Sequence, residues 1–190
     1  MSLEKIDYEL PQEIKNRISI KNIKDGIGHD LAGLYCDIYI DKKKVGYLND
    51  DGYGGETDLE ITEEANKVFE ELLVKHNFNK YMFENGWDFY ENKEEISFNS
   101  QKEHVVTSLY NLKQKEKEQK KLIKLFQTHV VYGDINRQKL YGWKGSTLRQ
   151  MIDRFGVDNI QAMIDKSIKP ELKKGKTILN TNFEELGLIK

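Results

Sequence analysis

Cysteine and proline are scarce in this sequence of 190 residues, and long apolar runs are missing from it. The single cysteine, Cys36, excludes an intrachain disulfide and any zinc site built from several cysteines. No stretch approaches the roughly 20 apolar residues of a membrane span, and the first residues lack the apolar segment of a signal peptide. We therefore expect a protein of a reducing compartment, cytoplasmic by default, without a membrane partner.

Recognisable catalytic and cofactor motifs are also missing. The four histidines are isolated from one another, and residues 142–147 (GWKGST) have the wrong order for a phosphate-binding P-loop. Residues 49–56 (NDDGYGGE) lack the ligand order of an EF-hand, and their carboxylates would repel a phosphate. We therefore predict no catalytic residues, no metal site and no cofactor. An enzyme whose site assembles only in three dimensions is the third of our hypotheses.

What the sequence does have is charge of opposite sign in its two halves. Residues 1–96 contain 12 Lys and Arg against 22 Asp and Glu, whereas residues 97–190 contain 18 against 10. The net charges of −10 and +8 agree with the total of −2. Such asymmetry indicates an anionic partner for the basic half, or docking between oppositely charged halves.

The first half is predicted to consist of antiparallel strands and one helix. Residues 34–40 (LYCDIYI) alternate between apolar and polar, and a lysine-rich turn at 41–44 separates them from a second short strand, which is typical of a hairpin. Thr62 is a predicted helix cap. The expected segments are an irregular lead-in at 4–16 broken by Pro11, a strand at 17–23, the hairpin at 34–48, an acidic loop at 49–56, a helix at 63–76, and a second hairpin at 78–90 around Asn85-Gly86.

The second half is predicted to begin with a long helix at residues 101–126, capped by Ser100. Its middle, residues 113–121 (KQKEKEQKK), has no apolar residue, which is typical of a solvent-exposed connecting helix. The expected segments after it are strands at 128–132 and 139–143, a helix at 148–155 capped by Ser146 or Thr147 and ended by Gly156, a helix at 159–167 capped by Asp158, a basic loop at 169–176, and a strand within 177–183.

These segments predict an α+β protein with antiparallel strands, a long charged connecting helix and a small C-terminal α+β portion. We place an acidic N-terminal domain at residues 1–99, the connecting helix at 100–126 and a basic C-terminal subdomain at 127–190. The polar middle of the long helix is the reason for separating the two outer parts, because it offers no apolar stripe to a core.

One resemblance follows from these motifs. Residues 37–48 (DIYIDKKKVGYL) with residues 49–55 (NDDGYGG) resemble small bacteriophage and prophage proteins, which similarly run strand, basic turn, strand, acidic Gly-Gly loop and helix. The lysine-rich helix followed by a strand pair and a helical pair at 129–164 is also similar. This resemblance covers about half of the chain. The family has no established activity, so it implies only the context of a mobile-element accessory protein.

Our leading hypothesis is a non-enzymatic accessory protein that binds another protein through its acidic portion. The carboxylates to test first are Asp50, Asp51 and Glu56. Self-association through the oppositely charged halves is a variant of this hypothesis.

The second hypothesis is nonspecific binding of nucleic acid by the basic half, because clustered lysines neutralise phosphates. The candidate phosphate contacts are Lys120, Lys121, Lys124, Arg137, Lys173 and Lys174.

Overall fold

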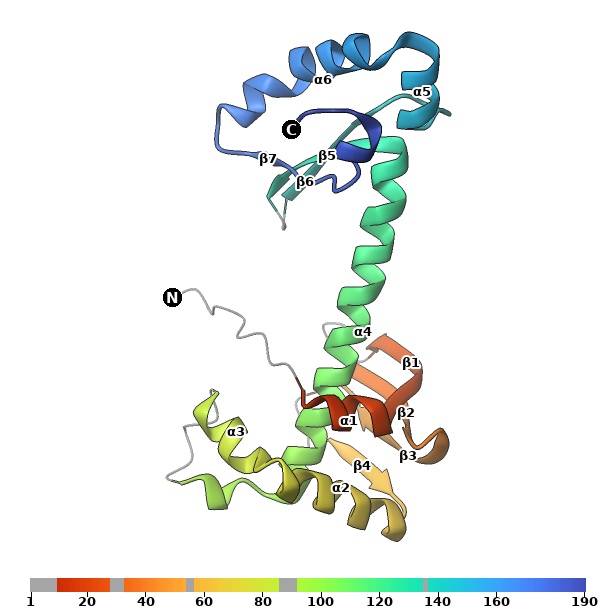
Figure 1. Cartoon of the computed structure of the whole chain (residues 1–190). Coiled ribbons are helices and arrows are strands. Elements are labelled where there is room, and N and C mark those ends of the chain that lie inside the picture. The colour runs from red at the N-terminus through yellow and green to blue at the C-terminus, as the bar shows by residue number, and fades with distance from the viewer. Residues whose placement is uncertain (1–9, 28–32, 54–56, 86–91, 135–136) are drawn as a thin grey trace. The chain divides into compact units, whose positions relative to one another are not determined.

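The computed structural model describes residues 10–27, 33–53, 57–85, 92–134 and 137–190 (Figure 1). The chain divides into two compact units, Met1–Lys113 and Gln114–Lys190, which we call unit 1 and unit 2. The division falls inside one 31-residue helix, α4 (Phe98–Thr128). Helices and antiparallel sheets occur in both units, which confirms the predicted α+β class. Unit 1 has 14 Lys and Arg against 23 Asp and Glu, and unit 2 has 16 against 9.

The sheet of unit 1 is an antiparallel meander in the order β1-β2-β3-β4. Its strands are β1 (Ile18–Ile27), β2 (Gly33–Ile40), β3 (Lys43–Asp50) and β4 (Asp58–Ile61). Cys36 and Ile38 on β2 are fully buried in the core, as the alternation of this strand predicts. The predicted loop at 49–56 begins too early, because β3 continues to Asp50, and β4 corresponds to no predicted segment.

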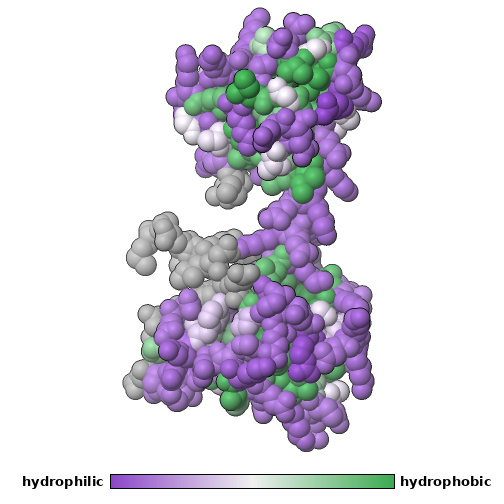
Figure 2. Space-filling view, in the orientation of Figure 1, coloured by the Kyte–Doolittle hydropathy of each residue, from purple (hydrophilic) through white to green (hydrophobic). Residues whose placement is uncertain are grey.

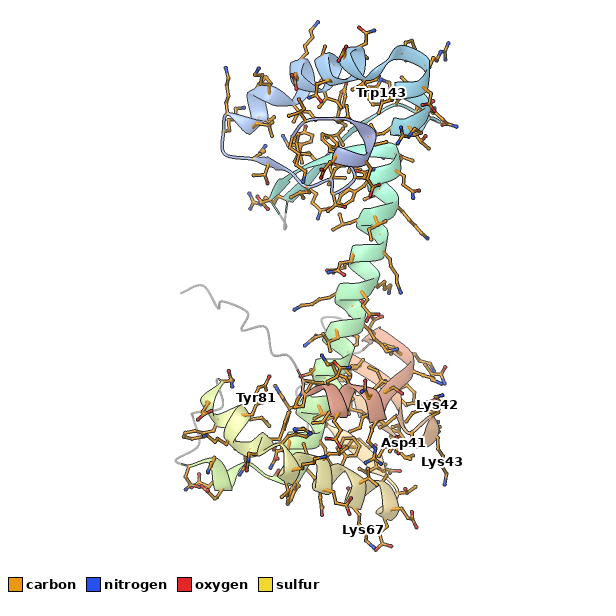
Figure 3. All side chains as sticks on the ribbon, viewed as in Figure 1. Asp41, Lys42, Lys43, Lys67, Tyr81 and Trp143 are labelled. Atoms are coloured by element: carbon orange, nitrogen blue, oxygen red, sulfur yellow. The ribbon has the colours of Figure 1, made fainter. Side chains whose placement is uncertain are left out.

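The predicted hairpin of β2 and β3 is confirmed, but its turn is shorter than expected. Asp41 (φ 48°) and Lys42 (φ 72°) form a two-residue turn in the left-handed region, which suits the twist of the flanking strands. The predicted four-residue turn is therefore wrong, since Lys43 and Lys44 belong to β3. Figure 3 shows Asp41, Lys42 and Lys43 at the outer end of this hairpin.

Four helices pack on the core face of this sheet. They are α1 (Gln12–Arg17), α2 (Glu63–Lys75), α3 (Phe78–Glu84) and the first part of α4. The cap of α2 is confirmed, because the Ala65 N–H donates to Thr62 Oγ1 at 3.3 Å. The predicted irregular lead-in is wrong for residues 12–16, which belong to α1 and bury Ile14, whereas residues 4–9 lie outside the described residues. Pro11 directly precedes this helix, a place where its missing N–H costs nothing.

The second predicted hairpin is wrong where the structure describes it, because residues 78–84 form α3. Phe78 and Met82 lie one helical turn apart and are both fully buried, so packing favours the helix over two strands. Gly86 and the predicted return strand lie outside the described residues. The cap of α4 is also corrected, because the Ser100 N–H donates to Ser97 Oγ at 3.1 Å and Ser97 is therefore the cap.

Unit 2 places helices against a small sheet of order β6-β5-β7. Its elements are β5 (His129–Asp134), β6 (Arg137–Gly142), α5 (Leu148–Phe155), α6 (Val157–Leu172) and β7 (Thr177–Ile178). Two short 3₁₀ turns complete the described elements, η2 (Lys93–Glu95) in unit 1 and η3 (Glu184–Leu186) in unit 2. The predicted strand pair and α5 are confirmed. Thr147 and Gln150 form a reciprocal capping box at its start, with hydrogen bonds of 3.1 and 2.8 Å.

The last helix is longer than predicted at both ends. It begins directly after Gly156 rather than at Asn159, and it continues through Pro170 to Leu172. The basic loop predicted at 169–176 is therefore wrong for its first four residues. Burial of Ile168 and the ion pairs of Glu171 hold the final turn in place despite the proline, whose missing N–H removes one helical hydrogen bond.

Candidate functional site

Three lysines of unit 2 surround one glutamate, and we call this group the lysine cluster. Lys139 Nζ lies 2.9 Å from Glu171 Oε2, and Lys174 Nζ lies 3.0 Å from Oε1. Lys176 Nζ donates a third bond to Oε2. The cations come from β6, from the turn after α6 and from the residue before β7, so the cluster depends on the tertiary fold of unit 2.

The charges of the cluster do not cancel. Hydrogen bonds from Lys176, Lys139 and Lys174, in that order, hold the pKa of Glu171 far below its usual range, so this carboxylate is ionised at neutral pH. The bond to Glu171 in turn raises the pKa of Lys139. Three ammonium groups therefore share one carboxylate, and two positive charges remain in a fixed arrangement.

Three of the six predicted phosphate contacts lie at this corner of unit 2. Lys174 belongs to the cluster itself, and Lys173 is its neighbour at the end of α6. Arg137 precedes Lys139 by two residues on β6, so both side chains start from the same face of the strand. All of these positions are exposed on the strand or the turn. The corner is thus more basic than the cluster alone.

The other three predicted contacts lie on α4. Lys120, Lys121 and Lys124 are exposed, and with Lys117 they fall within an arc of about 100° around the helix, given 100° per residue. Figure 2 shows the middle of this helix as hydrophilic. These residues therefore form a basic stripe on a different element from the lysine cluster.

Glu171 was missed by the sequence analysis, which placed it in a basic loop. Its partners Lys174 and Lys176 are local, but Lys139 is 32 residues away and reaches it only because β6 and α6 are neighbours in the fold. An isolated acid inside a lysine-rich run was the one available signal. Such a pattern predicts an ion pair but gives no information about the distant partner.

The predicted protein-binding carboxylates lie in unit 1. Asp50 Oδ1 accepts a hydrogen bond from the Gly52 N–H, and Asp51 Oδ1 accepts one from the Tyr53 N–H, both at 2.9 Å. These bonds form two consecutive Asx turns after β3. Glu56 lies outside the described residues.

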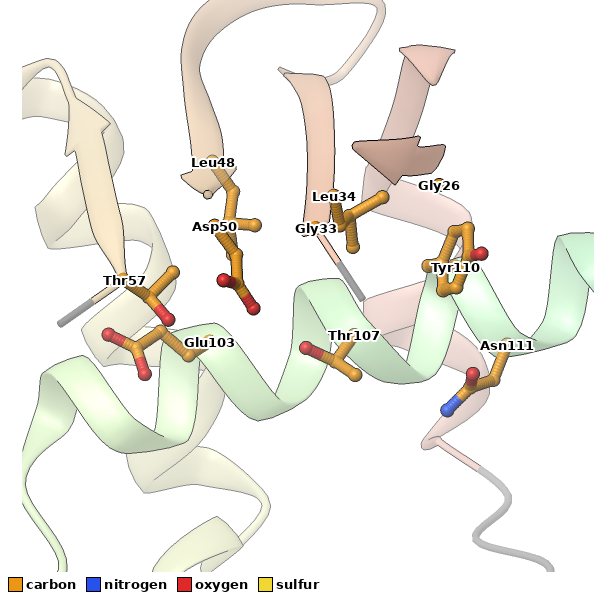
Figure 4. A pocket seen from close by; sticks show the side chains of 10 residues that line it. All are labelled: Gly26, Gly33, Leu34, Leu48, Asp50, Thr57, Glu103, Thr107, Tyr110 and Asn111. Carbon is orange, nitrogen blue, oxygen red and sulfur yellow. The ribbon is translucent and has the colours of Figure 1, made fainter. Parts of the chain in front are cut away.

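Asp50 also lines a pocket of about 220 Å³ at the open end of the sheet (Figure 4). Glu103 and Thr107 on α4 face Asp50 and Leu48 on β3, with Thr57 beside them. Two carboxylates and two hydroxyls over an apolar floor suit a cationic group with a short apolar stem. Glu103 thus adds a second carboxylate to the pocket beside that of Asp50, and no signal in the sequence indicated it.

Two further findings concern ligands and membranes. Within the described ranges, no group of three or more His, Cys, Asp and Glu side chains is arranged to hold a metal ion. No helix in the same part of the chain combines the length and the apolar composition needed to cross a membrane.

Comparison with protein families finds no matching family model, and comparisons with curated proteins and with solved structures find no match either.

Proposed function

We propose that this chain is a non-enzymatic binding protein whose unit 2 binds the phosphate backbone of nucleic acid. The observation that carries the proposal is the lysine cluster, in which one carboxylate fixes three ammonium groups and leaves two charges in excess. A phosphate gains from cations that are already held in place, because less side-chain entropy is lost on binding. A mobile-element context and a cytoplasmic location remain predictions from the sequence.

Binding of this kind is nonspecific with respect to sequence. Lysine is a point charge that attracts phosphate oxygens, whereas base reading needs donors and acceptors aimed into a groove. The remainder of unit 2 adds to the attraction, since its 16 Lys and Arg outnumber its 9 Asp and Glu. We therefore expect affinity that depends steeply on salt and little on base composition.

The test is fluorescence anisotropy of labelled single- and double-stranded DNA and RNA, titrated with the full chain from about 50 to about 300 mM salt. The decisive variant replaces Lys139, Lys174 and Lys176 by Gln. Because the cluster has two uncompensated charges, we expect this variant to reduce the slope of log affinity against log salt by about 2 on duplex DNA.

The matched control removes the same charge from three other lysines of unit 2. Lys144, Lys166 and Lys190 are exposed and do not contact Glu171, so Gln at these positions tests net charge alone. The proposal requires a larger loss in the cluster variant than in this control. Equal losses, or no binding by the unmodified chain at low salt, would refute it.

A second candidate function is supported by the pocket in unit 1. Asp50 and Glu103 would receive a lysine or arginine side chain of a protein partner, as in our leading hypothesis from the sequence. Replacing both by their amides removes two charges while keeping the shape of the pocket. Pull-down with the unmodified chain and with this variant tests it: a partner retained equally by both would exclude the pocket as the binding site.

A further inference from the structure

The sheet of unit 1 has a second face, opposite the core, which we call the tyrosine face. Its centre holds Tyr35 and Tyr39 on β2 and Tyr47 on β3, all half-buried. The described helices α1 to α4 each contribute side chains to the core on the other side of the sheet, so none of them covers this face. A sheet face with three tyrosines and no helix over it suits a protein contact, because tyrosine is enriched in such interfaces.

The strand register arranges charge across this face in a simple order. One row runs Lys24, Tyr35, Asn49 and Asp58 from β1 to β4. The next row runs Lys21, Asp37, Tyr47 and Glu60. In both rows a lysine stands at the β1 edge and a carboxylate at the β4 edge, and all four of these edge residues are exposed.

The aromatic centre is held together by its own contacts. The Tyr35 and Tyr47 rings stack with centroids 5.9 Å apart, and the Tyr47 hydroxyl donates to Asp58 at 3.2 Å. Lys21 Nζ lies 4.4 Å from the centroid of Tyr39. These contacts fix the rings before any partner arrives, so little ordering is needed on binding.

The one charge at the centre is already neutralised. Asp37 is 4% exposed and accepts hydrogen bonds from Asn22 at 2.6 Å and from Tyr35 at 3.0 Å. Lys44 Nζ lies 2.7 Å from Asp37 Oδ1, the same oxygen that accepts the bond from Tyr35. A partner could therefore cover Asp37 without leaving a buried charge unpaired, which would otherwise be costly.

The net charge of the tyrosine face determines what kind of partner it fits. Lys21, Lys24 and Lys44 are balanced by Asp37, Asp58 and Glu60, so the face has no net charge. A polyanion such as nucleic acid gains nothing from a neutral face. A surface with cations along one edge and anions along the other is instead complementary to itself.

We propose that two copies of this chain pack their tyrosine faces together about a two-fold axis parallel to the strands. This axis keeps each row at the same height and exchanges its two ends. It places Lys24 of one copy over Asp58 of the other, and Lys21 over Glu60. A two-fold axis perpendicular to the strands would set lysines against lysines, so the charge order selects the first arrangement.

The size of the face sets the strength of this dimer. Four strands about 4.8 Å apart, with about five residues each at 3.3 Å, cover roughly 300 Å² per copy in projection. Stable interfaces bury about 800 Å² per partner, so this face alone gives a weak dimer. The proposal is independent of nucleic-acid binding by unit 2.

The test is sedimentation velocity of the full chain from about 10 to about 1000 μM at low salt, where edge charges are least screened. One variant replaces Lys21 and Lys24 by Glu, and a second replaces Asp58 and Glu60 by Lys. Each alone sets like charges against each other at both edges, so we expect its dimer to weaken by about tenfold or more. Circular dichroism verifies that both variants fold.

The decisive sample is the equimolar mixture of the two variants. Their edges carry opposite charges, so the mixture should restore the affinity of the unmodified chain. General attraction between acidic unit 1 and basic unit 2 predicts something else: the first variant would associate more strongly and the second more weakly. That outcome would overturn the proposal. So would a mixture that associates no more strongly than either variant alone, or an unmodified chain that stays monomeric at every concentration.

Discussion

The side chain of Asn180 replaces backbone pairing at a point where a strand ends. Asn180 is fully buried and follows β7, which stops at Ile178. Its Oδ1 accepts a hydrogen bond from the Val131 N–H at 2.6 Å, and its Nδ2 donates to the His129 carbonyl at 3.0 Å. Nδ2 also lies 3.4 Å from the carbonyl of Phe126, near the end of α4. One carboxamide thus joins the long helix, β5 and the segment after β7.

Replacing Asn180 by Ala removes a partner from two backbone groups of β5. Each buried polar group left without a partner costs about 1–3 kcal/mol, so we expect the free energy of unfolding of unit 2 to fall by about 2–5 kcal/mol. Asn182→Ala is the matched control. It removes two bonds, from Asn182 Nδ2 to the Phe126 carbonyl at 3.0 Å and from Asn180 Nδ2 to Asn182 Oδ1 at 3.3 Å. Asn182 is half-buried, and both of its partners keep another hydrogen bond, so this change should cost only about 1 kcal/mol.

The assay is urea denaturation followed by fluorescence of Trp143, which packs on the core of unit 2. The other tryptophan, Trp87, is replaced by Phe in all samples so that the signal reports this unit alone. A shift of the midpoint without a change in slope identifies a loss of stability. If Asn180→Ala and Asn182→Ala differ by less than about 0.5 kcal/mol, the proposed role of the carboxamide is wrong.

Two further predictions concern unit 1. A Cβ at Gly46 would lie 1.9 Å from the Glu60 carbonyl oxygen, so Gly46→Ala should separate β4 from β3. We expect this change to lower the free energy of unfolding by about 1–3 kcal/mol, as measured by urea denaturation. Hydrogen exchange in β4 should also become faster. Burial lowers the pKa of His104, so as the pH drops the unfolded chain binds a proton at this histidine before the folded chain does. The free energy of unfolding should therefore decrease as the pH drops below about 6.5. In denaturation at a series of pH values, His104→Gln should make this decrease smaller.

Local signals account for the parts of the fold that the sequence predicted well. Alternation over residues 34–40 determines which face of β2 is buried, because side chains of a strand alternate between two faces. Thr62 and Thr147 mark helix starts by accepting backbone hydrogen bonds within three residues. These interactions depend on neighbours in the chain, so a single sequence is enough to find them.

Errors arose where tertiary packing overruled a local signal. Asn85-Gly86 and the surrounding aromatics are typical of a hairpin, yet Phe78 and Met82 are buried from one face of a helix. The helix ends at Glu84 with Asn85 as its C-cap, so Asn85 marks the end of an element. Pro11 had the same ambiguity, because proline both ends helices and begins them.

The candidate sites were less accessible from the sequence than the fold. Lysine-rich segments could be identified by composition, but only the contact between β6 and α6 brings Lys139 to Glu171. The tyrosine face needs the register of four strands, which depends on the bulges between Lys21 and Lys24 and between Ile38 and Tyr39. A register shift of one residue would turn Tyr35 toward the core. The register that buries the apolar side chains of β2 therefore also places the tyrosines on the opposite face.

In both the tyrosine face and the lysine cluster a carboxylate holds lysines in place, but the number of lysines for each carboxylate differs. Asp37 holds one lysine, and the pair is neutral, so the face around it can be buried against another face of matching charge. Glu171 holds three lysines, and the excess charge favours a partner that brings anions of its own. Because each carboxylate fixes its lysines, the ratio of cations to anions, rather than their number, separates self-association from nucleic-acid binding. Salt should therefore weaken both interactions, but only the first should recover when the edge charges are exchanged between copies.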